Sequence, residues 1–115
     1  MEQEQYYIGT DLKFCITITG EGFSQDDDDW EAKIVCNNKA ITYEKIGTDP
    51  DLWKGVITDG NGNYYIMVDT TQFQSGLVKM IVTAYVPDQD FDESSEGECI
   101  RREVAVQDLC YIKKP

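Results

Sequence analysis

Two acidic stretches carry the residue types best suited to bind a cation. Four consecutive aspartates occupy residues 26–29, and a second acidic stretch covers residues 88–98. Neighbouring carboxylates repel one another, and calcium relieves this repulsion because it takes about six to eight oxygen ligands. Solvated, like-charged loops are the competing interpretation, since neither stretch has the spacing of a helix-flanked calcium loop. The candidate calcium ligands are Asp26, Asp27, Asp28, Asp29, Asp90 and Asp92.

Catalytic constellations are missing from the chain. It has no histidine, which removes the commonest general base and every Ser-His or Cys-His pair. No glycine-rich phosphate-binding motif is present. Paired carboxylates can hydrolyse glycosidic bonds across a cleft, but with 22 acidic residues among 115, close pairs are uninformative. We expect a protein that is not an enzyme and has no cofactor beyond the candidate calcium.

Aromatic and apolar residues at predicted surface positions are candidates for binding. Ile81 and Tyr85 lie on the outer face of a predicted strand at residues 77–87, and an apolar outer face is typical of an interface. Trp53 and Tyr65 add aromatic surface, which can contact a protein or stack on a sugar ring. Cross-strand aromatic pairs that stabilise a sheet are the alternative. These four residues form the predicted interface set.

The charge balance limits the partners. Ten Lys and Arg face 22 Asp and Glu, which gives a formal net charge of −12. Such a chain repels phosphates and anionic lipids, so we expect neither nucleic acid nor a membrane as a partner. Residues 1–5 are polar and acidic, unlike a secretory signal. We therefore expect cytoplasmic synthesis, with an extracellular location as the alternative if a signal has been removed.

Four cysteines, Cys15, Cys36, Cys99 and Cys110, permit two disulfides in three pairings. No Cys-x-x-Cys motif occurs, and without histidine a zinc site would need all four scattered thiolates. We expect reduced thiols, with Cys99 the most exposed because it adjoins the acidic stretch.

Turn signals and alternating hydrophobicity divide the chain into strands. Asp59-Gly60-Asn61-Gly62 supplies residues that tolerate positive φ, and Asn37-Asn38 marks another turn. Pro87 should end its strand, since it has no N–H for the ladder, and the pattern slips near residues 107–108, which predicts a bulge. The predicted strands cover residues 6–10, 11–19, 30–37, 39–46, 52–58, 63–68, 77–87 and 100–112.

These strands predict an all-β fold, an immunoglobulin-like antiparallel β-sandwich of seven or eight strands. A closed barrel is the alternative, because both architectures bury alternate residues. The sandwich spans residues 6–112, between a disordered tail at 1–5 and an exit tail at 113–115. Lys45 shares its strand face with Ile41 and Tyr43. The predicted core contains Phe14, Ile16, Ile18, Trp30, Ile34, Ile66, Val68, Val78, Met80, Val82, Val104 and Val106.

A polar corner connects two of the predicted strands. Asp69 and Thr70 can cap the amides of one helical turn, Phe73 can close the edge of the sandwich, and Gly76 gives the backbone freedom to enter the next strand. We interpret this corner as structural.

The corner also carries a family resemblance. Four segments of the chain resemble small sandwich modules of prophage and mobile-element regions in gut anaerobes. The segments are Asp69-Thr70-Thr71-x-Phe73-x-x-Gly76-Leu77-Val78, Val82-Thr83-Ala84-Tyr85-Val86-Pro87-Asp88-x-Asp90-Phe91, Arg101-Arg102-Glu103-Val104 and Gly9-Thr10-Asp11-Leu12-Lys13-Phe14. The longer segment at residues 93–99 departs from that pattern. The resemblance implies a structural role in a tail, baseplate or head fibre.

The expected function is therefore a non-enzymatic structural or protein-interaction module of a phage-type virion or attachment assembly. Its expected partners are other protein subunits or a second copy of itself. The alternative is a secreted or cell-surface glycan-binding module, which would expose Trp53 beside Tyr64 or Tyr65.

Overall fold

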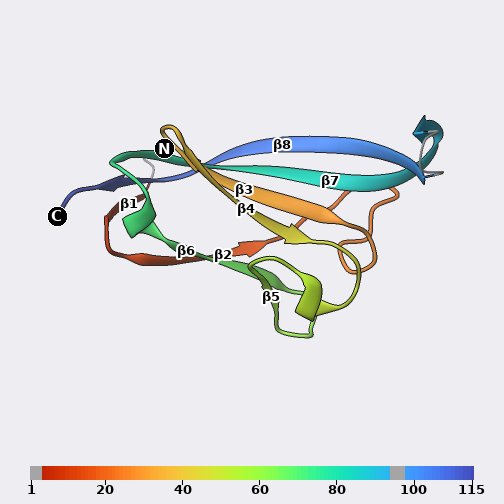
Figure 1. Ribbon diagram of the computed structural model, residues 1–115, viewed down its shortest axis with the longest axis horizontal. Helices are drawn as coiled ribbons and strands as arrows, with labels where there is room; N and C mark the ends of the chain where they lie inside the picture. Colours follow the sequence, from red (N-terminus) through yellow and green to blue (C-terminus); the bar gives the residue numbers. More distant parts are fainter. Residues whose placement is uncertain (1–3, 94–97) are drawn as a thin grey trace.

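The computed structural model describes residues 4–93 and 98–115. This part of the chain is built almost entirely from β-strands, with two single 3-10 turns (Figure 1). The elements are β1 (Glu4–Tyr7), β2 (Asp11–Ile16), β3 (Trp30–Cys36), β4 (Lys39–Lys45), η1 (Pro50–Leu52), β5 (Val56–Thr58), β6 (Tyr64–Asp69), η2 (Thr70–Gln72), β7 (Gly76–Glu93) and β8 (Glu98–Lys113).

The strands form two sheets. One has five strands in the order β1-β8-β7-β3-β4, and the other has three in the order β2-β6-β5. The two-layer arrangement confirms the all-β prediction and favours a sandwich over a closed barrel. Neighbouring strands are antiparallel except β1, which pairs with β8 in parallel, so the prediction of a purely antiparallel fold is wrong at this strand.

The core lies between the two sheets. Trp30 and Ile34 of β3, and Ile66 of β6, are completely buried, and Val78 of β7 is nearly so. Of the other predicted core residues, Phe14, Ile18 and Val82 are partly buried and pack against this cluster. Alternation along the strands therefore predicted most of the core.

Val104 and Val106 are the exception, because each is 62% exposed. Val106 pairs with Ile81 and Val104 with Thr83, so both valines lie on the outer face of the five-stranded sheet. Alternation shows that two residues share a face, but it does not show which face that is. Placing these valines in the core was wrong.

Pro87 does not end its strand as predicted, and of the predicted loop at residues 88–98 the described residues 88–93 and 98 belong to strands. Residues 94–97 lie outside the described part of the chain. β7 continues to Glu93 and pairs with β8, which begins at Glu98. Pro87 pairs with Ile100 at the start of an irregularity, and the next pair is Asp92 with Cys99. Proline is tolerated beside a bulge because the ladder is interrupted there.

Several boundaries also differ from the prediction. β1 begins at Glu4, within the predicted tail, and β2 ends at Ile16 instead of residue 19. The predicted strand at 52–58 is shortened to β5, because η1 and Gly55 precede it. The bulge near residues 107–108 is confirmed, since the ladder skips Leu109 between Cys110 and Asp108.

Both predicted turns are present. Asn37 has φ of 55°, and Gly60 and Gly62 have φ of 81° and 86°. Asn and Gly adopt such backbone angles at low cost, which explains these two hairpins.

The three-stranded sheet covers only part of the five-stranded sheet, and β8 forms the upper edge of the molecule (Figure 1). All residues from 102 to 108 are exposed, on both faces of β8. In the described part of the chain, no helix has the length and apolar character needed to cross a membrane.

Candidate functional site

The carboxylates of the acidic loop at residues 26–29 bind groups of the protein itself. The carboxylate of Asp28 accepts a hydrogen bond of 2.8 Å from the backbone N–H of Ser24, and that of Asp29 accepts one of 2.8 Å from the N–H of Gly47. The Tyr64 hydroxyl donates to the carboxylate of Asp26. The carboxylate of Asp27 accepts a hydrogen bond of 3.2 Å from the hydroxyl of Ser24, so all four carboxylates of the loop accept hydrogen bonds from the protein.

The loop also surrounds a cation, which is the side chain of Lys45. This lysine is 0% exposed, and its Nζ donates to the backbone carbonyls of Asp26 at 2.7 Å and Asp28 at 3.0 Å. Burial lowers the pKa of Lys45, and the carboxylate of Asp29, followed by the other three, opposes that shift. A buried ammonium needs such compensation because desolvation disfavours its charge.

Lys45 is the main feature of this site that the sequence analysis did not assign. The signal was its position on the same strand face as the buried Tyr43. A lysine at an inward position predicts either a strand end or an internal partner for the charge, and residues 26–29 supply that partner.

The candidate calcium ligands are not brought together. Among the described side chains, those of residues 4–91 and 99–115, no three His, Cys, Asp or Glu gather into a metal-binding group. Asp90 lies in the irregularity of β7, where its N–H donates to the carboxylate of Asp88 at 3.0 Å. Asp88 also accepts from Nε of Arg101 at 2.9 Å, and its pKa is lowered, first by the Asp90 N–H and then by Arg101. The side chain of Asp92 lies outside the described residues.

An aromatic cluster lies beside Lys45. The ring of Tyr64 packs edge-on against Trp30, with centroids 5.7 Å apart, and contacts Trp53 at 5.8 Å. Nζ of Lys45 lies 5.6 Å from the centroid of Trp53, which is a favourable cation–π distance. The indole N–H of Trp53 donates to the carbonyl of Gly47 at 3.1 Å. Trp53 is therefore half-buried and part of this cluster.

Tyr64 gives the cluster a pH dependence. Burial, followed by the hydrogen bond to Asp26, raises the pKa of Tyr64 from 10.0 to about 12. The native state therefore holds the Tyr64 proton more tightly than the unfolded state does. The contribution of this proton to the free energy of unfolding is complete below pH 10 and is lost as the pH rises from 10 through about 12.

We expect the free energy of unfolding to fall by roughly 2 kcal/mol over this range through Tyr64, and Tyr64→Phe to make the alkaline decline shallower. Urea unfolding at pH values between 8 and 12 measures this. Tyr111→Phe, at an exposed position, should keep the wild-type slope, and an equally steep decline in Tyr64→Phe would contradict the assignment.

The predicted interface residues divide between two surfaces and the aromatic cluster. Ile81 and Tyr85 lie on the outer face of the five-stranded sheet, each half-buried. Tyr65 lies on the outer face of the other sheet, where Nζ of Lys13 is 4.6 Å from the centroid of its ring. Since Trp53 belongs to the aromatic cluster, the four residues do not form one binding surface.

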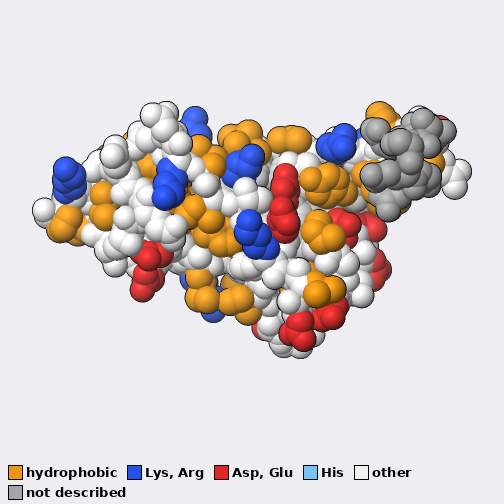
Figure 2. All heavy atoms as spheres, viewed as in Figure 1, with side chains coloured by type: hydrophobic (Ala, Val, Ile, Leu, Met, Phe, Trp, Pro, Cys, Tyr) orange, Lys and Arg blue, Asp and Glu red, His pale blue; other side chains and the backbone are white. Residues whose placement is uncertain are grey.

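The outer face at β7 and β8 is the larger apolar candidate. Val106 lies beside Ile81, and Val104, two residues further along β8, lies beside Thr83. In Figure 2, hydrophobic side chains appear on the upper edge of the molecule, where Figure 1 places β8. Ile81 and Tyr85 were predicted on this face, whereas Val104 and Val106 were predicted in the core.

The structural corner has the predicted parts. Asp69 caps η2 by accepting from the N–H of Thr71 at 3.0 Å. Thr70 is buried, and its hydroxyl donates to the carbonyl of Thr10 and accepts from the N–H of Gly9. Phe73 is buried against the core.

Gly76 completes the corner through a close approach to the neighbouring hairpin. A Cβ at Gly76 would lie 2.9 Å from Nδ2 of Asn37, a side chain that donates to the carbonyl of Ser75 at 2.7 Å. The corner therefore joins the β3–β4 turn to the start of β7.

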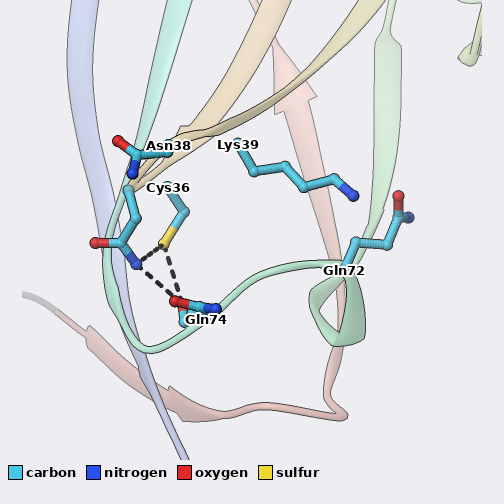
Figure 3. Close-up of a pocket in the computed structure, with 6 residues that line it drawn as sticks. Cys36, Asn38, Lys39, Gln72 and Gln74 are labelled. Atoms are coloured by element: carbon cyan, nitrogen blue, oxygen red, sulfur yellow. Dashed lines mark hydrogen bonds between the residues drawn. The ribbon is translucent and has the colours of Figure 1, made fainter.

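A shallow pocket of about 250 Å³ opens next to this corner (Figure 3). Lys39 extends toward Gln72 across the opening, and the thiol of Cys36 donates to the carbonyl of Gln74 at 3.3 Å. Burial raises the pKa of Cys36, so this thiol stays protonated and unreactive at neutral pH. The other lining residues are Asn37 and Asn38.

The four cysteines are free, as expected. Cys36 and Cys110 both pair with Val78, from opposite sides of β7. Their Cα atoms are therefore separated by two strand spacings, which together are about 9–10 Å. A disulfide requires Cα atoms within about 7 Å. Cys15 is exposed and Cys99 only partly so, which corrects the expectation that Cys99 is the most exposed.

No protein-family model, curated protein or solved structure matches the chain. The resemblance to prophage modules therefore depends on the sequence motifs alone, and the function has to be argued from the surfaces.

Proposed function

We propose that this protein is a non-enzymatic structural module that makes protein–protein contacts through the outer face of its five-stranded sheet at β7 and β8. The observation that carries the proposal is the exposure of Val104 and Val106, each 62%, beside Ile81. β-Branched residues on an uncovered sheet face gain free energy when another surface removes them from water.

Charged residues surround this apolar patch. Lys79 pairs with Asp108 at one end of it, and Tyr85 pairs with Arg102 at the other. On the β3 side, Lys33 pairs with Ile81 and Glu31 with Thr83. An apolar centre with a charged border of both signs is the usual composition of a protein interface.

The strand order supports an immunoglobulin-like assignment of the sandwich. A five-stranded sheet whose outermost strand is the N-terminal β1, opposite a three-stranded sheet, fits the division of strands in variable-type immunoglobulin domains. The buried Trp30 at the start of β3 takes the place of the core tryptophan of that fold. Such sandwiches commonly serve as building units of surface assemblies, and the sequence resemblance suggests a phage-type assembly.

The proposal predicts self-association that depends on the patch. Light scattering over a range of protein concentrations should show the wild type associating, and Val106→Lys should weaken association by about tenfold, because a charge would have to be desolvated in the contact.

Met67→Lys is the matched control, since Met67 is 55% exposed on the outer face of the other sheet. It should associate like the wild type. A wild type that stays monomeric up to about millimolar concentration, or equal weakening by both substitutions, would contradict the proposal.

A further inference from the structure

The edge of β8 between Arg101 and Leu109 has no neighbouring strand in the described part of the chain. β7 pairs with one side of β8 along its length, whereas β1 pairs with the other side only from Cys110 to Lys113. At the opposite end, regular pairing with β7 stops at Ile100, where the irregularity begins. The free edge is therefore a nine-residue segment with Ala105 at its midpoint.

The centre of this edge is open to pairing, whereas charged residues occupy its two ends. Natural edge strands are shortened, bulged, covered, or protected by proline and by charged residues. Here the centre is Val104-Ala105-Val106, with no bulge between Asp108 and Ile100 and every residue from 102 to 108 exposed. None of the backbone hydrogen bonds of the described loops and turns ends on residues 101–109. An exposed, regular edge with an apolar centre is a template for a further strand.

We propose that the strand which completes this edge is β8 of a second copy, antiparallel to the first, with a two-fold axis at Ala105. This inference rests on the proposed function and names its partner. The midpoint of the free edge sets the register, because a copy centred at Ala105 pairs the regular segment 102–108 of one chain with the same segment of the other and leaves the bulged Leu109 outside the ladder. Residues on one face then oppose residues on the same face, as pleating requires.

The register matches the side chains. Across the axis, Arg102 of one copy opposes Asp108 of the other, and Val104 opposes Val106. Each pair occurs twice because of the two-fold symmetry, and all of these residues lie on the outer face. On the inner face Glu103 opposes Gln107, and Ala105 opposes Ala105 of the second copy. The small alanine side chains avoid a steric clash at the axis. Opposite charges and β-branched pairs are favourable cross-strand neighbours. The contact joins the two apolar outer faces into one continuous surface.

A charge exchange tests the register. Arg102→Asp and Asp108→Arg each place like charges opposite one another in a homodimer, so each variant alone should dimerise about tenfold or more weakly than the wild type. An equimolar mixture should recover dimerisation, because both opposed pairs become attractive in the heterodimer.

Asp108→Arg is the sharper of the two variants. It reduces the net negative charge, so general repulsion between copies would predict stronger association, whereas the register predicts weaker association. Sedimentation velocity of each variant and of the mixture measures this. A mixture no tighter than its components, or an Asp108→Arg variant tighter than the wild type, would overturn the register.

Cross-linking separates this inference from the proposed function. In a Cys15→Ser, Cys99→Ser background, Ala105→Cys should oxidise to a disulfide-linked dimer, because the two Cys side chains would be direct cross-strand neighbours. Lys33→Cys, two strands away on the outer face, should not.

The reverse pattern, with cross-linking at residue 33 and not at 105, would mean face-to-face packing of the sheets, which overturns the edge pairing and leaves the proposed function standing. No association of the wild type in sedimentation would overturn both.

Discussion

Replacing Lys45 with methionine should lower the free energy of unfolding by about 3 kcal/mol. Methionine keeps most of the length of the side chain, so the loss comes from the ammonium and not from a cavity. The carbonyls of Asp26 and Asp28 lose their donor, and residues 26–29 keep four carboxylates without a nearby cation. Carbonyls that lose their donor and an uncompensated cluster of like charge each cost free energy.

Urea unfolding at pH 7 measures this effect, and Lys39→Met is the matched control. Lys39 lies at the other end of β4 and is exposed, so the same change of charge should alter the free energy of unfolding by less than about 0.5 kcal/mol. Equal effects of the two substitutions would show that Lys45 contributes only through net charge.

Replacing Gly55 with alanine should cost about 3 kcal/mol. Gly55 has φ of 74°, and a Cβ there would lie 2.5 Å from Cδ1 of Tyr43. Tyr43 cannot move away easily, because it is buried and its hydroxyl donates to the carbonyl of Met67 at 3.1 Å. Left-handed backbone accounts for about 1 kcal/mol of the loss, and displacement of the ring accounts for the rest.

Gly60→Ala separates these two contributions. Gly60 has a similar φ of 81°, but no atom lies within 4 Å of its virtual Cβ, so only the cost of about 1 kcal/mol for the backbone remains. Both variants can be compared by urea unfolding. Similar losses would mean that the contact with Tyr43 is unimportant for the approach of β5 to β4.

Local patterns predicted the strands but not the surface on which the proposed function depends. Period-two alternation placed Ile34, Ile66 and Val78 in the core, where each packs between two sheets. The same alternation placed Val104 and Val106 there, because it cannot distinguish a buried face from an apolar outer face. Only the register with β7 shows that Val106 lies beside Ile81.

The acidic loop could be predicted as a cation site, but its cation could not be identified. The sequence separates Lys45 from residues 26–29, and their contact depends on how the loop folds over the end of β4. The long β7–β8 hairpin was missed for a related reason. Pro87 has a local tendency to end a strand, and the pairing of Asp92 with Cys99 beyond the irregularity overrides it.

Hydrogen–deuterium exchange at low and high protein concentration tests the self-association through β8 most directly. The account predicts that amides in residues 101–109 gain protection as the concentration rises, while those of β4, the opposite edge of the same sheet, do not change. Unchanged exchange at residues 101–109 over the whole concentration range, or new protection confined to β4, would contradict it.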